Sequence, residues 1–116
     1  MDQSTFDAAR IAAMNTRCQA VTEATRRHRA AMKQARRDYD ERLAKAEAEH
    51  EAVKSGPDFA IAREANVRLH EIRNVGPGPD LEAVRHQLSH DIDEADAAYN
   101  ATMAEVQRQK EEQEQQ

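Results

Sequence analysis

Apolar and small residues recur along the first half of the chain in steps of three or four, which is the spacing of one face of an α-helix. The steps average 3.5 residues, as in a heptad seam between packed helices. Two successive steps of four, from Ala35 to Tyr39 to Leu43, resemble a stutter that locally unwinds a supercoil. The stripe comprises Ile11, Met14, Cys18, Val21, Thr25, His28, Met32, Ala35, Tyr39, Leu43, Ala46, His50 and Val53.

Two short breaks interrupt this helical pattern, and they contain every glycine and proline of the chain, at Gly56-Pro57 and at Gly76 to Pro79. Glycine costs ~1 and proline ~3 kcal/mol inside a helix, so the breaks divide the chain into three helical segments. We expect helices at about 4–54, 58–73 and 80–112. Ser4 and Asp7 form a capping-box pattern at the start of the first helix.

The glycines and prolines also predict how the helices end and begin. Gly56 is placed to end the first helix in the left-handed conformation. Pro57 then suits the first position of the second helix, where Asp58 follows near the positive end of the helix dipole. Gly78-Pro79-Asp80 repeats this pattern before the third helix.

The second and third helices each carry one apolar stripe. In the second it is Ile61, Ala65, Leu69 and Ile72, and in the third it is Leu81, Val84, Leu88, Ile92, Ala95, Tyr99, Met103 and Val106. The predicted fold is therefore all-α: an elongated, coiled-coil-like protein forming a single domain over 1–112, with a polar tail at 113–116. We expect oligomer or helix-packing contacts at Ile11, Met14, Cys18, Val21, Met32, Tyr39, Leu43, Leu81, Leu88, Ile92 and Tyr99.

Two layouts are compatible with this pattern. If the second helix returns antiparallel along residues 38–54, the third then runs parallel to the first and passes its end. If the second helix instead packs across that end, the third returns antiparallel toward Arg37. Residues 1–37 carry a net charge of +5 and residues 38–116 a net charge of −10, so charge pairing favours the second layout.

Six Lys and Arg residues lie between Glu23 and Asp38 with no acidic residue among them. Five of them share a helical arc of about 100°, and we predict that this basic face binds a partner. The alternatives are a protein partner and a face that is merely solvated or paired with the chain's own acidic helix, and nucleic acid is less favoured than either because no aromatic residue is interleaved for base stacking. The five residues are Arg26, Arg29, Lys33, Arg36 and Arg37.

No residue pattern predicts catalysis, a cofactor or a metal site. His86 and His90 have i, i+4 spacing, but they lie opposite the apolar stripe and belong to an exposed polar face. The single cysteine, Cys18, allows no internal disulfide, and no apolar run approaches the ~20 residues that cross a bilayer. With no signal peptide pattern at the N-terminus, we expect a cytoplasmic location.

Composition limits the core, because 22 of the 116 residues are alanine. So little large apolar surface favours a homo-oligomer or a bound partner. The leading hypothesis is a non-enzymatic helical adaptor or assembly protein. In its small, Ala/Arg/Glu-rich helical style the chain is similar to phage and bacterial accessory proteins, which implies the host cytoplasm or the virion if a phage encodes it. The alternative functions are an acidic nucleic-acid mimic that inhibits a host enzyme, and a nucleic-acid-binding protein.

Overall fold

The computed structural model describes residues 2–115 and consists of three α-helices joined by two short breaks. They are α1 (Gln3–Val53), α2 (Phe59–Val75) and α3 (Gly78–Glu114), and the described residues contain no strand. The predicted all-α fold with a very long first helix is confirmed. Helix α3 extends further than expected, into the polar segment that follows residue 112.

Helix α1 begins one residue earlier than predicted because Asp2, rather than Ser4, caps its first turn. The backbone N–H of Thr5 donates to Asp2 Oδ1 at 2.7 Å. This hydrogen bond lowers the pKa of the Asp2 carboxyl, since it stabilises the ionised form. The capping box predicted at Ser4 and Asp7 is wrong, because the side chain of Asp7 accepts a hydrogen bond from Gln3 Nε2 instead.

The first break reverses the chain without a left-handed glycine. The N–H of Gly56 donates to the Val53 carbonyl at 3.0 Å, and Gly56 does not have a positive φ, which corrects the predicted left-handed end of α1. Asp58 is the N-cap of α2, where its Oδ1 accepts from the N–H of Ile61 at 3.2 Å. Pro57 therefore precedes the cap instead of opening the helix.

The second break is shorter and has a different geometry. Gly76 ends α2 with φ 66° and ψ −170°, and its N–H donates to the Ile72 carbonyl at 3.0 Å. This backbone conformation is accessible essentially only to glycine. Helix α3 begins at Gly78, and Asp80 lies in its first turn. The two Gly-Pro-Asp segments therefore start helices in different ways, with the aspartate as the cap in the first and inside the helix in the second.

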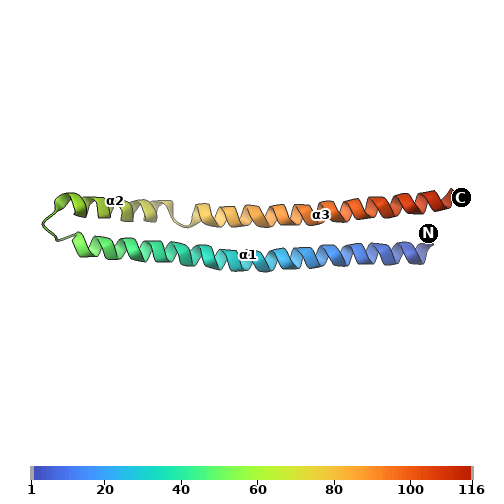
Figure 1. Ribbon diagram of the computed structural model, residues 1–116, viewed down its shortest axis with the longest axis horizontal. Coiled ribbons are helices and arrows are strands. Elements are labelled where there is room, and N and C mark those ends of the chain that lie inside the picture. Colours follow the sequence, from blue (N-terminus) through green and yellow to red (C-terminus); the bar gives the residue numbers. More distant parts are fainter. Residues whose placement is uncertain (1, 116) are drawn as a thin grey trace. The chain divides into compact units, whose positions relative to one another are not determined.

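The helices form two compact units, which we describe separately. Unit 2 comprises Arg29–Arg85, where α2 lies alongside the second half of α1 (Figure 1). Three ion pairs join the facing helices: Arg68 to Glu49 at 3.9 Å, Arg73 to Glu47 at 3.4 Å and Asp80 to Arg42 at 2.9 Å. Because residue numbers rise on one side as they fall on the other, α2 and the first turn of α3 both run antiparallel to α1.

Unit 1 comprises the residues up to His28 together with those from His86 onward, so it pairs the first half of α1 with most of α3. Arg27 contacts Asp91 at 3.6 Å and Arg17 contacts Asp96 at 2.5 Å, so these helices are also antiparallel (Figure 1). Neither predicted layout is correct in full. Helix α2 returns along α1 as in the first layout, and α3 is antiparallel to α1 as in the second.

Buried alanines form the centre of both units, and on α1 they recur every eleven residues. Ala13, Ala24, Ala35 and Ala46 are each less than a tenth exposed. The inward positions between them follow steps of four, four and three, which gives 3.67 residues per turn. The two steps of four after Ala35, interpreted from the sequence as a single stutter, are therefore part of the regular repeat of the helix.

The same eleven-residue spacing separates the buried Ala95 and Val106 of α3. Helix α2 differs, since its buried Ala65 and Leu69 belong to a row with heptad-type steps of three and four. The heptad period predicted for the first helix is therefore wrong, because the buried residues of α1 and α3 follow a longer period that stays closer to the 3.6 residues per turn of a straight helix.

Candidate interaction site on helix α1

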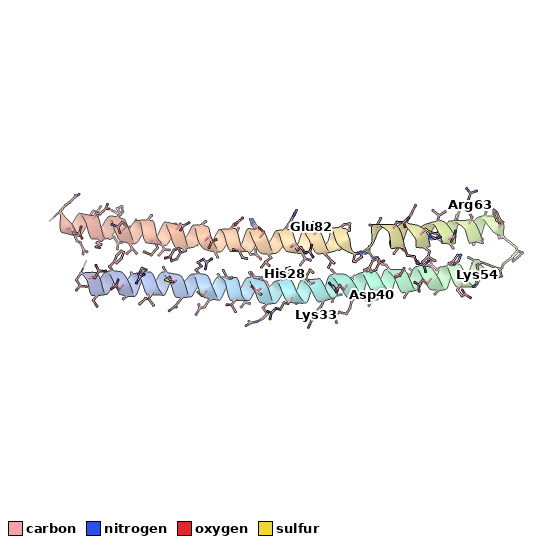
Figure 2. The ribbon with its side chains drawn as sticks, turned by 180° about the vertical axis from the view of Figure 1, so that it is seen from behind. His28, Lys33, Asp40, Lys54, Arg63 and Glu82 are labelled. Carbon is pink, nitrogen blue, oxygen red and sulfur yellow. The ribbon has the colours of Figure 1, made fainter. Side chains whose placement is uncertain are left out.

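A row of cations without ion-pair partners among the described residues lies on the exposed surface of α1 in unit 2. Arg29, Lys33, Arg36 and Arg37 are all exposed, and we call these four residues the basic row. Figure 2 shows Lys33 on the side of α1 away from the neighbouring helix. Among the described residues, none of the four forms an ion pair or a side-chain hydrogen bond. The basic row therefore has its full hydrogen-bonding capacity available to a partner.

Other arginines of α1 lie closer to the neighbouring helix and are engaged there. Arg42 pairs with Asp80 in unit 2, and in unit 1 Arg17 and Arg27 pair with Asp96 and Asp91. The hydrogen bond from Arg17 to Asp96 raises the pKa of the Arg17 guanidinium. The acidic residues of α3 therefore neutralise the arginines at the edge of the helix contact and leave the outer basic row uncovered.

Arg26, the fifth residue of the predicted basic face, belongs to unit 1 and is paired. Its guanidinium lies 3.4 Å from Glu23 one turn earlier, and both side chains are mostly exposed. Such a surface pair contributes little to stability, at most about 0.5 kcal/mol. We therefore separate Arg26 from the basic row.

The residues predicted for helix packing divide into two groups. Ile11 is 53% exposed, Met14 is 45% exposed and Cys18 is exposed, so these three face away from the contact with α3. The inward positions there are one residue earlier, at Ala13 and Arg17. The others are half-buried: Val21, Met32, Tyr39, Leu43, Leu81, Leu88, Ile92 and Tyr99.

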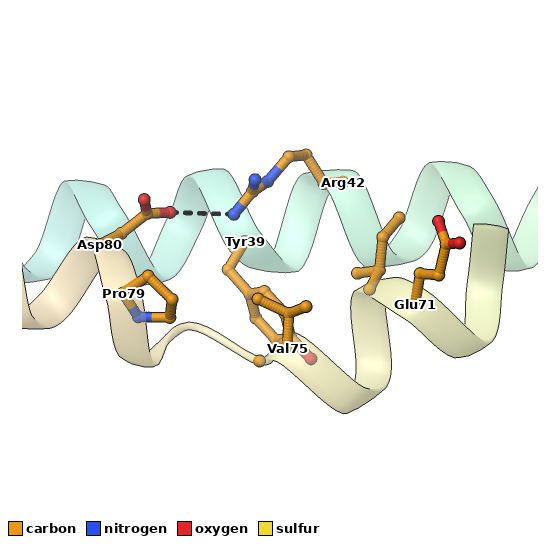
Figure 3. Close-up of a pocket in the computed structure, with 8 residues that line it drawn as sticks. Tyr39, Arg42, Glu71, Val75, Pro79 and Asp80 are labelled. Atoms are coloured by element: carbon orange, nitrogen blue, oxygen red, sulfur yellow. Dashed lines mark hydrogen bonds and ion pairs between the residues drawn. The ribbon is translucent and has the colours of Figure 1, made fainter.

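A shallow pocket of about 220 Å³ in unit 2 lies where the break between α2 and α3 leaves α1 uncovered (Figure 3). The side chains of Tyr39, Val75 and Pro79 line it, and the ion pair between Arg42 and Asp80 lies at its edge. This arrangement offers an apolar surface and a charge pair that neutralises itself. The pocket therefore resembles a binding site for an apolar side chain more than a catalytic site.

Histidine and carboxylate side chains do not converge on a metal-binding geometry in the part of the chain that the structure describes. His90 Nε2 lies 3.0 Å from Glu94 Oε1, one turn along the exposed face of α3, and His86 also has an interaction of its own. The Nδ1 atom of His28 is buried without a hydrogen-bond partner. No helix in residues 2–115 combines the length and apolarity needed to cross a membrane.

Charge pairs near the other helix ends perturb two more carboxyl groups. Hydrogen bonds from Arg108 lower the pKa of Glu105 and raise that of Arg108 itself, and a hydrogen bond from Lys54 lowers the pKa of Glu51. A lowered folded-state pKa stabilises the fold at pH values above the ordinary carboxyl value, and this contribution disappears as the pH falls through the folded-state pKa. All of these groups are exposed, and none lies beside the basic row.

Comparison with known protein families, curated proteins and solved structures gave no match to this chain.

Proposed function

We propose that this chain is a non-enzymatic helical adaptor or assembly protein that binds a negatively charged protein surface through the basic row of α1. The single observation that carries the proposal is that Arg29, Lys33, Arg36 and Arg37 have no ion-pair partner within residues 2–115, although the same helix has paired arginines. Four like charges on one helix face repel one another at i, i+4 spacing, so a row of this kind costs stability when nothing opposes it. An acidic partner surface would relieve that repulsion.

Protein is the favoured partner over nucleic acid for two reasons. The chain has a net charge of −5, which opposes the approach of a polyanion. Among the described residues, the one largely exposed aromatic side chain is Phe59, at 78%. It lies at the start of α2 and not beside the basic row, so no stacking platform accompanies the cations. We place the protein in the cytoplasm, or in the host cytoplasm or virion if a phage encodes it.

Affinity purification from the native host, followed by mass spectrometry, tests this proposal. The wild-type protein is compared with the R29E/R36E variant, which reverses two charges of the basic row. The matched control is K45E/R63E, because Lys45 and Arg63 are exposed cations of unit 2 that form no ion pair with any residue that the structure describes. We expect a specific partner that the wild type and the control retain and the R29E/R36E variant loses.

Retention of the same partners by R29E/R36E would contradict the proposal, as would the recovery of no specific protein with the wild type. Titration with duplex and single-stranded DNA at two salt concentrations identifies the nucleic-acid alternative. Salt-sensitive DNA binding that the R29E/R36E substitution abolishes would assign the basic row to phosphates instead of a protein.

A further inference from the structure

An acidic surface at the end of α3 complements the basic row. The last two and a half turns of α3, in unit 1, carry the exposed residues Glu105, Glu111, Glu112 and Glu114, which we call the acidic end. Its last turn contains no basic residue. Carboxylates at a helix C-terminus lie near the negative end of the helix dipole and are destabilised there. The acidic end is therefore an electrostatically unfavourable feature, as the basic row is.

The cations that accompany the acidic end do not neutralise it. Arg108 is shared between Glu105 and Glu112, and the Lys110 ammonium lies 4.5 Å from the centre of the Phe6 ring. Glu111 and Glu114 form no ion pair among the described residues. Residues 86–116, which form the α3 side of unit 1, contain eight Asp and Glu against two Lys and Arg. Carboxylates remain available for a partner that brings its own cations.

We propose that the occupant of the basic row is the acidic end of α3 from a second copy of this chain. The proposal rests on the function proposed above, because it names the partner of the same surface. The two surfaces have similar lengths: Arg29 to Arg37 rises ~12 Å and Glu105 to Glu114 ~14 Å along their helices. Arginine–carboxylate pairs between neighbouring helices already join α1 to α3 and α1 to α2 in this molecule. The contact repeats that chemistry between copies.

Such a contact is heterologous, because different surfaces of the two copies meet. Each copy keeps one free basic row and one free acidic end, so association continues into a ring or an open chain of molecules. Exposed ion pairs are weak and are screened by salt. The contact therefore forms at high protein concentration and low ionic strength, and it adds orientation to an assembly more than affinity.

Charge reversal on the full-length protein tests the proposal by sedimentation equilibrium over a wide concentration range. The R29E/R36E variant reverses the basic row, and E111K/E114K reverses the acidic end. We expect the wild type to associate reversibly at low salt and to dissociate at about 0.3 M NaCl, where the screening length is near 6 Å. For each variant alone, the association constant should fall at least about tenfold.

An equal mixture of the two variants provides the decisive measurement. R29E/R36E keeps a normal acidic end, and E111K/E114K keeps a normal basic row, so the mixture should recover association that neither variant shows alone. K45E/R63E controls for the charge change of the first variant. E64K/E71K controls for the second, because Glu64 and Glu71 are exposed and form no ion pair in the described part of the chain. Helical circular dichroism verifies that each variant is folded.

A wild type that stays monomeric at low salt throughout the concentration range would overturn this inference. So would reversals that leave association unchanged, or a mixture that does not recover it. These outcomes are distinguishable from failure of the proposed function. A monomeric wild type that still captures an R29E/R36E-sensitive partner from the host would leave the adaptor function standing and assign the basic row to a different acidic protein.

Discussion

Alanine is the residue that sets how closely the helices of each unit approach. Ala24 and Ala65 are each only 2% exposed, and no large side chain in the described part of the chain is fully buried. A methyl group buries little area, so its stabilising effect comes from the many short-range contacts that two closely spaced backbones make. A larger side chain at such a position has no room unless the helices separate.

Substitution of Ala24 by leucine should therefore destabilise the protein, although leucine is more hydrophobic. Overpacking a tight core site typically costs about 1–3 kcal/mol. Ala30→Leu is the matched control, because Ala30 is exposed on the same helix and should tolerate leucine within about 0.5 kcal/mol. Urea denaturation followed by circular dichroism measures both. Equal or greater stability of the A24L variant would show that the contact is not closely packed.

The residues that face the neighbouring helix could be predicted for α3 but not for the start of α1, and the buried alanines explain why the two helices differ. In α3, the predicted stripe from Leu81 to Val106 is the half-buried or buried face, because large apolar residues mark it. At the start of α1, the large apolar Ile11 and Met14 are exposed and Ala13 is buried. Hydrophobicity favours the larger side chains, whereas close helix approach selects the smaller one. A search for alanines eleven residues apart would have found the correct face.

The outward basic row is easier to anticipate than the inward arginines. The run of cations between Glu23 and Asp38 is visible in the sequence, but nothing local shows that Arg17 and Arg42 turn toward neighbouring helices while Arg29 and Arg36 do not. That distinction depends on which side of α1 the other helices occupy. It follows from tertiary structure and not from sequence spacing.

At the scale of the helices, the two breaks have different structural roles. The first reverses the chain over the residues between Val53 and Phe59, whereas the second, between Val75 and Gly78, leaves α2 and the start of α3 running in the same direction along α1. Glycine and proline positions predicted both breaks and the number of helices. They could not predict the direction of α3, which depends on the backbone angles of Gly76.

Replacement of Gly76 by alanine should destabilise unit 2 by about 1–3 kcal/mol, because a Cβ atom disfavours the backbone angles at this residue. The cost is purely conformational, since no atom lies within 4 Å of the added Cβ. Gly78→Ala is the control: its Cβ also meets nothing, and its φ is not positive. Thermal unfolding of both variants distinguishes them. Equal midpoints for G76A and G78A would contradict a conformational requirement at Gly76.

At the scale of the whole molecule, charge is distributed unequally between the two units. Unit 2 contains eleven Lys and Arg against eleven Asp and Glu, so the net charge of −5 comes entirely from unit 1. Burial is sparse in both units, and the buried apolar residues are Ala13, Ala24, Ala35, Ala46, Ala65, Leu69, Ala95 and Val106. Few buried apolar contacts imply local opening at low free energy.

Hydrogen exchange should follow this distribution of buried residues. We expect the slowest amide exchange in segments around Ala24, Ala35 and Ala65, and the fastest at the two breaks and beyond Val106, after which the remaining residues of α3 are mostly exposed. Mass spectrometry of deuterium uptake at peptide resolution measures the pattern. Uptake that is uniform along α3, or slowest at its end, would contradict the expectation for the isolated protein.

The eleven-residue spacing of buried alanines on α1 also restricts how the length of this protein can change. Eleven residues make three full turns, so an insertion or deletion of that size moves the contact face by ~16.5 Å along the axis without rotating it. A seven-residue change rotates the following residues by roughly 20–30° away from the neighbouring helix. Longer and shorter relatives of this chain should therefore differ in paired steps of eleven residues, one in α1 and one in the helix opposite.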